Sequence, residues 1–167
     1  MIYYTSFETV FGILGLIRNK KGLLKIYLPN EMLSENNLHK QYPNQELIED
    51  NSKFKHVIKQ LNEYFNGDRT NFELEMDLNV SPFYKKVLME VSKVPYGNTS
   101  TYSAIAQKLN NPKAVRAVGS ANARNPIPII IPCHRIITKS GMLGGYRGGL
   151  PMKEKLLKFE SNILNTN

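Results

Sequence analysis

Residues 101–124 read TYSAIAQKLNNPKAVRAVGSANAR, and this stretch decides the fold that we expect for the second half of the chain. Thr101 is a residue type that caps helices, and the apolar residues after it have helical spacing, which predicts a short helix through Leu109. An Asn-Pro pair at 111–112 repeats the signal of a cap followed by a first-turn proline, which predicts a second helix over residues 113–123. Two short helices joined by a tight turn indicate a helix-turn-helix, although many such pairs serve only packing.

The second of these helices consists mostly of small residues. Its small members are Ala114, Ala117, Gly119, Ser120, Ala121 and Ala123, and its long side chains are those of Arg116 and Arg124. A glycine inside a helix costs about 1 kcal/mol relative to alanine, so a close approach of the backbone to another body would explain its presence. That body is either a neighbouring helix or a DNA minor groove, which is only about 6 Å wide. The spacing alone does not distinguish the two.

The positive charge of the chain is concentrated in its second half. Residues 1–79 hold 9 Lys and Arg against 11 Asp and Glu, whereas residues 80–167 hold 13 against 3, which gives net charges of −2 and +10. Such a basic half indicates a polyanionic partner, nucleic acid first of all, and the alternative is a lysine-rich surface that serves solubility. Just inside the basic half, Ser81 and Pro82 combine a cap with a first-turn proline and predict the start of another helix.

The acidic half of the chain indicates a β-rich domain. Apolar runs at residues 11–17 and 23–28 flank a polar turn, which predicts a hairpin. Residues 30–45 are polar and predict a loop or a weak helix, and the apolar residues of the stretch 47–65 have helical spacing. Residues 72–78 alternate strictly between apolar and acidic side chains, which predicts a half-buried strand.

The sequence also limits the compartment in which we expect the protein. No apolar run approaches the roughly 20 residues of a membrane span, and the N-terminus lacks the basic and apolar regions of a signal peptide. A single cysteine cannot form an internal disulfide, which fits a reducing compartment. We therefore expect a cytoplasmic protein with no membrane partner.

The single cysteine lies in the segment NPIPIIIPCHRII, residues 125–137. An apolar run bounded by prolines is expected to bring Cys133 to a buried place, where a free cysteine is commonly a small core residue. Here His134 and Arg135 adjoin it, and a nearby base or cation favours the thiolate, which is the nucleophilic form. A cysteine hydrolase is the competing chemistry, but its histidine usually comes from elsewhere in the chain, and the two other histidines lie in the acidic half.

A glycine-rich loop, GMLGGYRGGL at residues 141–150, follows the cysteine. Such a loop can shape a flat pocket and expose backbone N–H groups. It is not a P-loop, because no Gly-Lys-Ser/Thr follows. Residues 153–159 then predict a closing helix with Leu156 and Leu157 inward, and Glu160 comes next.

Three of these motifs together resemble one family, the O6-alkylguanine-DNA alkyltransferases. They are Pro132-Cys133-His134-Arg135, the Gly-Tyr-Arg-Gly-Gly loop at 145–149 and the run NPKAVRAVG at 111–119, in that family's order between about Ser81 and Glu160. The resemblance implies an α+β protein of two domains. Residues 1–79 would form a structural RNase H-like domain of sheet and helix, and residues 80–167 a mostly helical, winged-helix-like domain that binds DNA and transfers the alkyl group. The N-terminal half matches only as a β-rich domain of the right length.

The resemblance also implies the roles of individual residues. Cys133 is similar to the alkyl acceptor, His134 to the residue that deprotonates it through a water, and Glu160 to the carboxylate that orients the histidine. Tyr102 resembles the tyrosine that hydrogen-bonds the flipped guanine, and Arg116 the side chain that fills the gap in the base stack. The implied pocket residues are Asn125, Ile136, Tyr146 and Arg147, and the implied DNA-contacting residues are Lys113, Ala114, Arg116, Ala117, Gly119 and Arg135.

The function that the resemblance implies is direct reversal of DNA damage. Once the damaged nucleotide has rotated out of the duplex, a methyl or larger alkyl group passes irreversibly from O6 of guanine, and less well from O4 of thymine, to Cys133. We expect a monomer that binds double-stranded DNA containing O6-alkylguanine, needs no cofactor and acts once.

Two departures and two alternatives remain. Some relatives carry an N-terminal zinc site, but the first half of this chain has no cysteine, so we expect no metal. Arg147 stands where some members have a smaller residue, which leaves the tolerance of bulky alkyl groups open. The alternatives are a sequence-specific helix-turn-helix regulator with Cys133 in its core, and a cysteine hydrolase.

Overall fold

A four-stranded sheet organises the first unit, Met1–Asn79, in a computed structural model that describes residues 1–166. The strands are β1 (Ile2–Thr9), β2 (Gly12–Asn19), β3 (Gly22–Tyr27) and β4 (Leu47–Glu49), in the spatial order β3-β2-β1-β4. The pairs β3–β2 and β2–β1 are antiparallel, and β4 runs parallel to β1. The hairpin predicted from the apolar runs is therefore confirmed as β2–β3, whereas β1 was not predicted.

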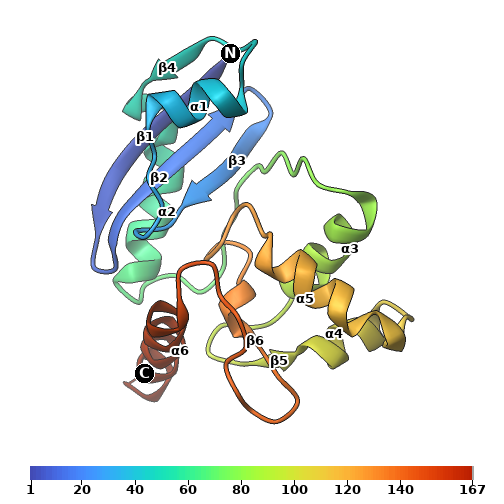
Figure 1. Cartoon of the computed structure of the whole chain (residues 1–167). Coiled ribbons are helices and arrows are strands. Elements are labelled where there is room, and N and C mark those ends of the chain that lie inside the picture. Colours follow the sequence, from blue (N-terminus) through green and yellow to red (C-terminus); the bar gives the residue numbers. More distant parts are fainter. Residues whose placement is uncertain (167) are drawn as a thin grey trace. The chain divides into compact units, whose positions relative to one another are not determined.

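One helix covers each face of this sheet. In Figure 1, α1 (Glu35–Gln41) lies in front of the strands and α2 (Lys55–Phe65) behind them. Leu38 of α1 packs in a buried cluster with Ile2, Ile17 and Tyr27, and α2 buries Val57, Leu61, Tyr64 and Phe65. Cover on both faces explains why four consecutive residues of β2, 14–17, are buried instead of alternating.

Two predictions for this unit are wrong. The stretch 47–65 is not one helix: its first residues form β4, and a 3-10 turn at Asn51–Phe54 precedes α2. Residues 72–78 form no strand, because their backbone groups make hydrogen bonds only at isolated points, although exposure does alternate over residues 72–76. The backbone of Leu23 in β3 makes hydrogen bonds to the residues on either side of Met76: its N–H donates to the Glu75 carbonyl, and its carbonyl accepts from the Asp77 N–H. The Gln60 side chain accepts a hydrogen bond from the Glu73 N–H and donates one to the Glu73 carbonyl, each at 2.9 Å.

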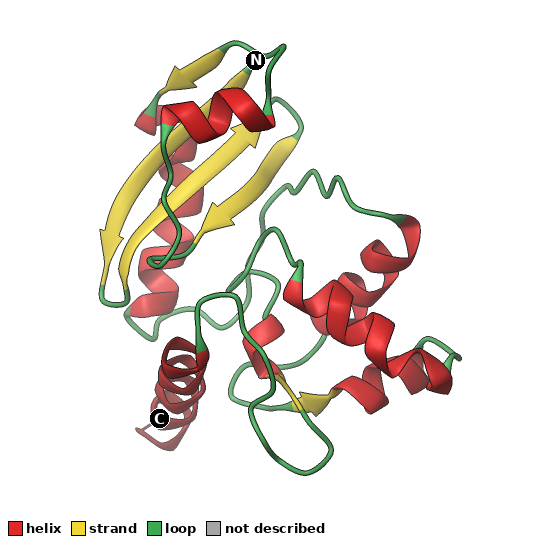
Figure 2. Ribbon diagram, viewed as in Figure 1, coloured by secondary structure: helices red, strands yellow, loops and turns green. Residues whose placement is uncertain are grey.

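The second unit, from Val80 onward, begins with three helices that contact one another (Figure 2). They are α3 (Pro82–Val91), α4 (Tyr102–Lys108) and α5 (Val115–Ala123). The predicted caps are confirmed, since Ser81 Oγ accepts from the Tyr84 N–H and Thr101 Oγ1 from the Ala104 N–H. The cap expected at Asn111 is not made, and the turn Pro112–Ala114 is 3-10 instead of α.

A short sheet and the last helix frame the cysteine. Strand β5 (Ser100–Thr101) pairs in parallel with β6 (Ile136–Ile137), and the 3-10 turn Cys133–Arg135 leads directly into β6. Helix α6 (Leu150–Thr166) contacts this turn and is longer than predicted at both ends, so that Glu160 lies within it. The cysteine turn is thus fixed between a strand and a helix, which are both rigid supports.

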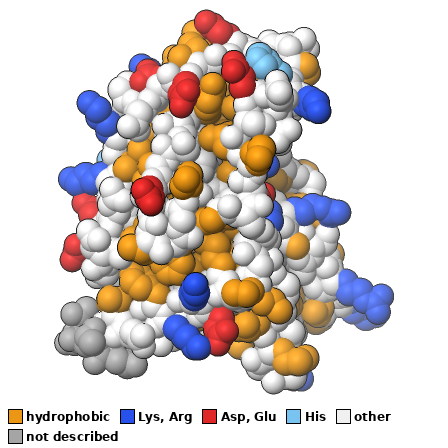
Figure 3. All heavy atoms as spheres, turned by 60° about the vertical axis from the view of Figure 1, so that its left-hand side comes forward, with side chains coloured by type: hydrophobic (Ala, Val, Ile, Leu, Met, Phe, Trp, Pro, Cys, Tyr) orange, Lys and Arg blue, Asp and Glu red, His pale blue; other side chains and the backbone are white. Residues whose placement is uncertain are grey.

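The surface mixes side chains of all kinds, as the face in Figure 3 shows. Hydrophobic side chains reach the surface there between charged ones, which is usual for globular domains. Within residues 1–166 no helix has the length and apolar character that crossing a membrane requires.

Candidate active site at Cys133

Asn125 holds the bend that delivers the cysteine. Its Nδ2 donates to the Ile131 carbonyl at 2.8 Å, and its Oδ1 accepts from the Ile127 N–H at 3.0 Å. Between these two contacts Ile129 adopts a φ of 74°, a left-handed conformation that is costly for a β-branched residue. The side chain of Asn125 therefore stabilises a strained turn, and Cys133 follows it with only 3% of its surface exposed.

The Cys133 thiol is protonated in the resting structure. Burial raises its pKa, and hydrogen bonding by Asn125 and the positive charges of Arg147 and Lys153 only partly oppose the rise. The expectation that the neighbours in sequence favour the thiolate is therefore wrong at rest, because burial outweighs them. The charges that do act on the sulfur come from the glycine-rich loop and α6, not from Arg135.

Glu160 binds both residues that follow the cysteine. Its Oε1 lies 2.7 Å from His134 Nε2 and accepts from Arg135 Nη2 at 3.0 Å, and its Oε2 accepts from Arg135 Nε at 2.9 Å. The Gly97 N–H donates to the same Oε2 at 3.1 Å. Burial would raise the pKa of Glu160, but the hydrogen bond from His134 and the hydrogen bonds and positive charge of Arg135 outweigh it and lower this pKa to about 2. Glu160 is thus a buried, fully bonded carboxylate.

His134 is neutral beside that carboxylate. Its side chain is fully buried, and burial lowers its pKa even though Glu160 acts in the opposite direction. Because a carboxylate only accepts hydrogen bonds, the proton of the neutral ring lies on Nε2. Nδ1 is then a lone-pair acceptor, and it is buried with no hydrogen-bond partner among residues 1–166. The site therefore holds an oriented base next to the thiol residue.

The structure does not place Arg135 where the resemblance implied. Only 4% of Arg135 is exposed, and its Nη1 donates to the Val94 carbonyl at 2.6 Å while the rest of the guanidinium binds Glu160. A side chain with its donors used inside the fold is not available to phosphates. We therefore correct its assignment from a DNA contact to a support of Glu160.

Lys153 is a functional candidate that the sequence reasoning missed. It is fully buried, and its Nζ donates to the carbonyls of Ile136, at 2.6 Å, of Leu143 and of Gly145, at 3.4 Å. Burial lowers its pKa to about 8, against the opposing effect of Cys133. Its position three residues before the inward-facing Leu156 was a signal that it lies on the buried side of the helix. Lys153 ties the glycine-rich loop to β6.

Three predicted pocket residues lie around the cysteine turn. Arg147 Nη1 donates to the Asn125 carbonyl at 2.9 Å, and the Tyr146 ring stands edge-on to that of His134, with centroids 6.5 Å apart. A Cβ on Gly144, where φ is 67°, would lie 2.7 Å from the Tyr102 hydroxyl, so the loop can pass this tyrosine only as glycine. Burial raises the pKa of Tyr102, and an ionised Cys133 would raise it further. Ile136 itself is buried in β6.

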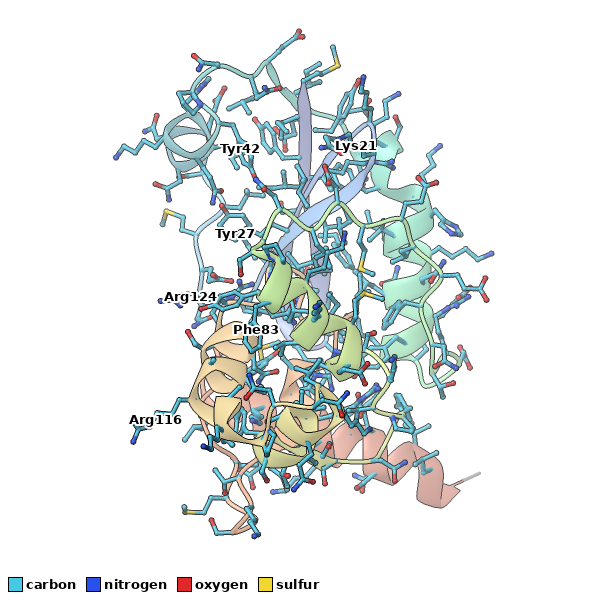
Figure 4. All side chains as sticks on the ribbon, turned by 90° about the vertical axis from the view of Figure 1, so that its right-hand side faces the viewer. Lys21, Tyr27, Tyr42, Phe83, Arg116 and Arg124 are labelled. Atoms are coloured by element: carbon cyan, nitrogen blue, oxygen red, sulfur yellow. The ribbon has the colours of Figure 1, made fainter. Side chains whose placement is uncertain are left out.

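The residues predicted to contact DNA lie on or just before α5. Lys113 and Arg116 are exposed, while Ala114, Ala117 and Gly119 are partly buried. Arg116 and Arg124 both project from α5 toward the left of Figure 4. Arg124 is held there by hydrogen bonds to the Tyr84 hydroxyl, at 2.6 Å, and to Ser120 Oγ, at 2.7 Å. The two arginines are thus exposed, whereas Cys133 and His134 are buried.

The architecture and the site define a class: a sheet-and-helix unit followed by a helix-turn-helix unit with one buried thiol. Two family models match the chain in that order, 6-O-methylguanine DNA methyltransferase, ribonuclease-like domain, over residues 2–78, and its DNA binding domain over residues 82–162. The expected combination of a ribonuclease-like and a DNA-binding domain is confirmed. Across the described chain, no three His, Cys, Asp or Glu side chains come together in a way that could hold a metal ion.

Individual relatives agree along almost the whole chain. A methylated-DNA–protein-cysteine methyltransferase of Methanosarcina acetivorans is 39% identical over 96% of this chain and 99% of its own. The constitutive enzyme of that name from Bacillus subtilis is 38% identical over 98% and 95%. The crystal structure of Mycobacterium tuberculosis O6-methylguanine methyltransferase, 36% identical, matches with a TM-score of 0.85 over 97% of this chain and 94% of its own. The chain belongs to the methylated-DNA–protein-cysteine methyltransferase family.

Proposed function

We propose that this protein repairs DNA by moving a methyl or other alkyl group from O6 of guanine to the sulfur of Cys133. The observation that carries the proposal is the ionised Glu160 bonded to a neutral, buried His134, whose Nδ1 is left as an acceptor. A buried thiol needs such a base before it can react, because burial has raised its pKa. The family of the chain supports the same chemistry.

The proposed transfer is a displacement at the alkyl carbon. His134 Nδ1 takes the thiol proton through a bridging water, and Glu160 stabilises the imidazolium that forms. The S–C bond forms while the C–O6 bond breaks, and its electron pair passes to the guanine. Tyr102 supplies a proton to the departing base, and the imidazolium proton later restores the tyrosine through solvent. The product is a thioether for which the chain offers no regenerating group, so each molecule acts once.

The charges of two side chains assist the sulfur during this step. Arg147 and Lys153 both favour the ionised form of Cys133. Each is itself held by backbone carbonyls, Arg147 by that of Asn125 and Lys153 by those of β6 and the glycine-rich loop. Groups held in this way need little rearrangement when the thiolate forms, which is the condition for effective electrostatic stabilisation. We assign Arg147 and its partner Asn125 to the pocket, together with Tyr146, whose ring stands edge-on to that of His134, and Ile136 of β6.

The proposed substrate is duplex DNA that carries O6-alkylguanine, and the weaker substrate is O4-alkylthymine. The reacting atom cannot be reached inside the stack, so the nucleotide has to rotate out, at a cost of a few kcal/mol. Exposed Lys113 and Arg116 would hold the backbone and fill the gap. A relative from Mycobacterium tuberculosis, 35% identical with a TM-score of 0.85, has been solved in complex with DNA. We place the protein in the cytoplasm, where a thiol stays reduced. We expect it to act there as a monomer.

The test is the mass of the protein after incubation with O6-benzylguanine. The wild-type protein should gain one benzyl group, located on Cys133 by peptide mapping, and release guanine in equal amount. The Cys133→Ser variant should gain nothing. Repeated turnover would favour a hydrolase, and an unchanged mass together with one preferred DNA sequence would favour the regulator.

A further inference from the structure

Asn122 is a buried residue of helix α5 that reaches the backbone of the cysteine. It is 4% exposed, and its Nδ2 donates to the main-chain carbonyl of Cys133 at 3.2 Å. The contact joins the helix that carries Arg116 to the nucleophile's own backbone. None of the roles assigned above uses this side chain.

The carboxamide of Asn122 is only partly used. Its Oδ1 is buried and has no hydrogen-bond partner in the described chain. An unsatisfied buried acceptor costs about 1–3 kcal/mol, so an apolar residue would serve packing better at this position. The hydrogen bonds of this buried side chain therefore explain its presence better than packing does, and Nδ2 has a second hydrogen beyond the one given to the Cys133 carbonyl.

Tyr102 lies against the face of α5 that Asn122 shares. Gly119 precedes Asn122 by three residues and therefore lies on the same side of the helix. A Cβ built on Gly119 would be 3.9 Å from Tyr102 Cδ1, an ordinary packing distance. Hydrogen bonding by Asn122 also lowers the pKa of Tyr102, against the larger effect of burial and the effect of Cys133. A donor to the phenol oxygen has this effect, because it stabilises the phenolate.

We propose that Asn122 is a positioning residue that donates one hydrogen bond to the Cys133 carbonyl and one to the Tyr102 oxygen. The second bond occupies the acceptor side of the phenol, so that its O–H is directed to the pocket. As the C–O6 bond breaks, the Tyr102 O–H bond breaks too, and its proton goes to a ring nitrogen of the departing guanine. The resulting tyrosinate keeps the Asn122 bond until the proton held by His134 restores it through solvent. This inference rests on the proposed function and deepens it.

The experiment varies how much the departing base needs a proton. Two free-base probes are used, O6-benzylguanine and 8-bromo-O6-benzylguanine, whose electron-poor ring leaves more readily and needs Tyr102 less. The variants are Asn122→Leu and Asn122→Met, which both remove the donor, so that one serves if the other does not fold. Ser120→Ala is the matched control, since Ser120 lies on the same helix but contacts Tyr84.

The Asn122 variants are expected to lose more reaction rate with O6-benzylguanine than with the bromo probe. The Asn122 variants should react about tenfold more slowly than the wild-type protein with O6-benzylguanine, and their loss of rate with the bromo probe should be much smaller. Tenfold is a part of the roughly 10²–10⁴-fold that general acid catalysis contributes. In the Tyr102→Phe background the Asn122 substitution should add no further loss. Equal losses on both probes, unchanged rates, or additive losses with Tyr102→Phe would each overturn the inference. Failure of the wild-type protein to react would instead overturn the proposed function.

Discussion

The guanidinium of Arg135 binds both carboxylate oxygens of Glu160, through Nε at 2.9 Å and Nη2 at 3.0 Å. The two residues are 4% and 0% exposed, so this is a buried bidentate ion pair between the cysteine turn and α6. It fixes the carboxylate that orients His134, and it supplies the positive charge that keeps that carboxylate ionised.

Removal of Arg135 should destabilise the protein strongly. Arg135→Met would leave the Glu160 charge buried with only part of its partners, and such a loss costs about 3–5 kcal/mol. Chemical denaturation at neutral pH measures the change in the free energy of unfolding. Arg116→Met is the control, because Arg116 is exposed on α5 and its loss should cost no more than about 0.5 kcal/mol. Equal stability of the two variants would show that the buried pair contributes nothing.

The rate of transfer should stay high well into the acid range. His134 has to be neutral to act as base, and burial keeps its pKa below the ordinary value of about 6.5. The acid limb of the rate with free O6-benzylguanine should therefore lie below pH 6.5, with a plateau above it. This profile is measured by mass analysis of samples stopped at a series of pH values from about 4.5 to about 9.

His134→Gln gives the matched profile for a site without the base. The Cys133 thiol, whose pKa is raised, would then lose its proton only to solvent, so the rate should be low at pH 7 and rise steadily with pH. A plateau that persists in His134→Gln would contradict the assignment of His134 as base.

The parts of the fold that the sequence predicted are those with local signals. Ser81 with Pro82 predicted the start of α3, and the cap Thr101 predicted that of α4, because a cap acts on the turn beside it. The strand predicted at 72–78 does not form, because a strand needs a partner along its length and this segment is bound only at isolated points, by the backbone of Leu23 and the side chain of Gln60. Which groups would pair across the chain is not written in the segment itself.

The site shows the same division. Cys133, His134 and Glu160 could be named from their motifs and the resemblance, and the structure brings His134 and Glu160 into contact. The burial of Arg135 could not be predicted, since a motif does not reveal whether a cation faces solvent or a carboxylate. Lys153 was overlooked because its partners are backbone carbonyls, which carry no sequence signal.

Arg116 should matter for DNA and little for the chemistry. It is exposed on α5 and is proposed to hold the damaged nucleotide outside the stack. Arg116→Ala should slow repair of O6-methylguanine in duplex DNA by about tenfold or more, since extrusion costs a few kcal/mol, and should leave the reaction with free O6-benzylguanine nearly unchanged. Gel assays of duplex repair and mass analysis of the free-base reaction provide the comparison. Equal losses on both substrates would mean that Arg116 acts on folding or on the thiol.

Alkylation of Cys133 should destabilise the folded protein. Cys133 is 3% exposed, and Ile131, two residues before it, is 1% exposed. A methyl group added to the sulfur therefore enters a dense interior. Overpacking of this kind costs about 1–3 kcal/mol. The thioether also has no proton to give, so the thiol could no longer satisfy the buried, unpartnered Nδ1 of His134 through the water proposed for the transfer.

The two adducts separate volume from lost hydrogen bonding. Both adducts lack the thiol proton, but a benzyl group is far larger than a methyl group. The melting temperature of the benzylated protein should therefore fall below that of the methylated protein unless the pocket already has room for the ring. Thermal melts of unreacted, methylated and benzylated protein at one pH and salt concentration give the order, and Cys133→Ala, which lacks the thiol without added volume, shows the cost of losing the thiol alone. Destabilised products would also be cleaved faster by a protease, because cleavage follows the population of open forms. Unchanged or raised melting temperatures for both adducts would contradict the prediction and would indicate a cavity that the alkyl group fills.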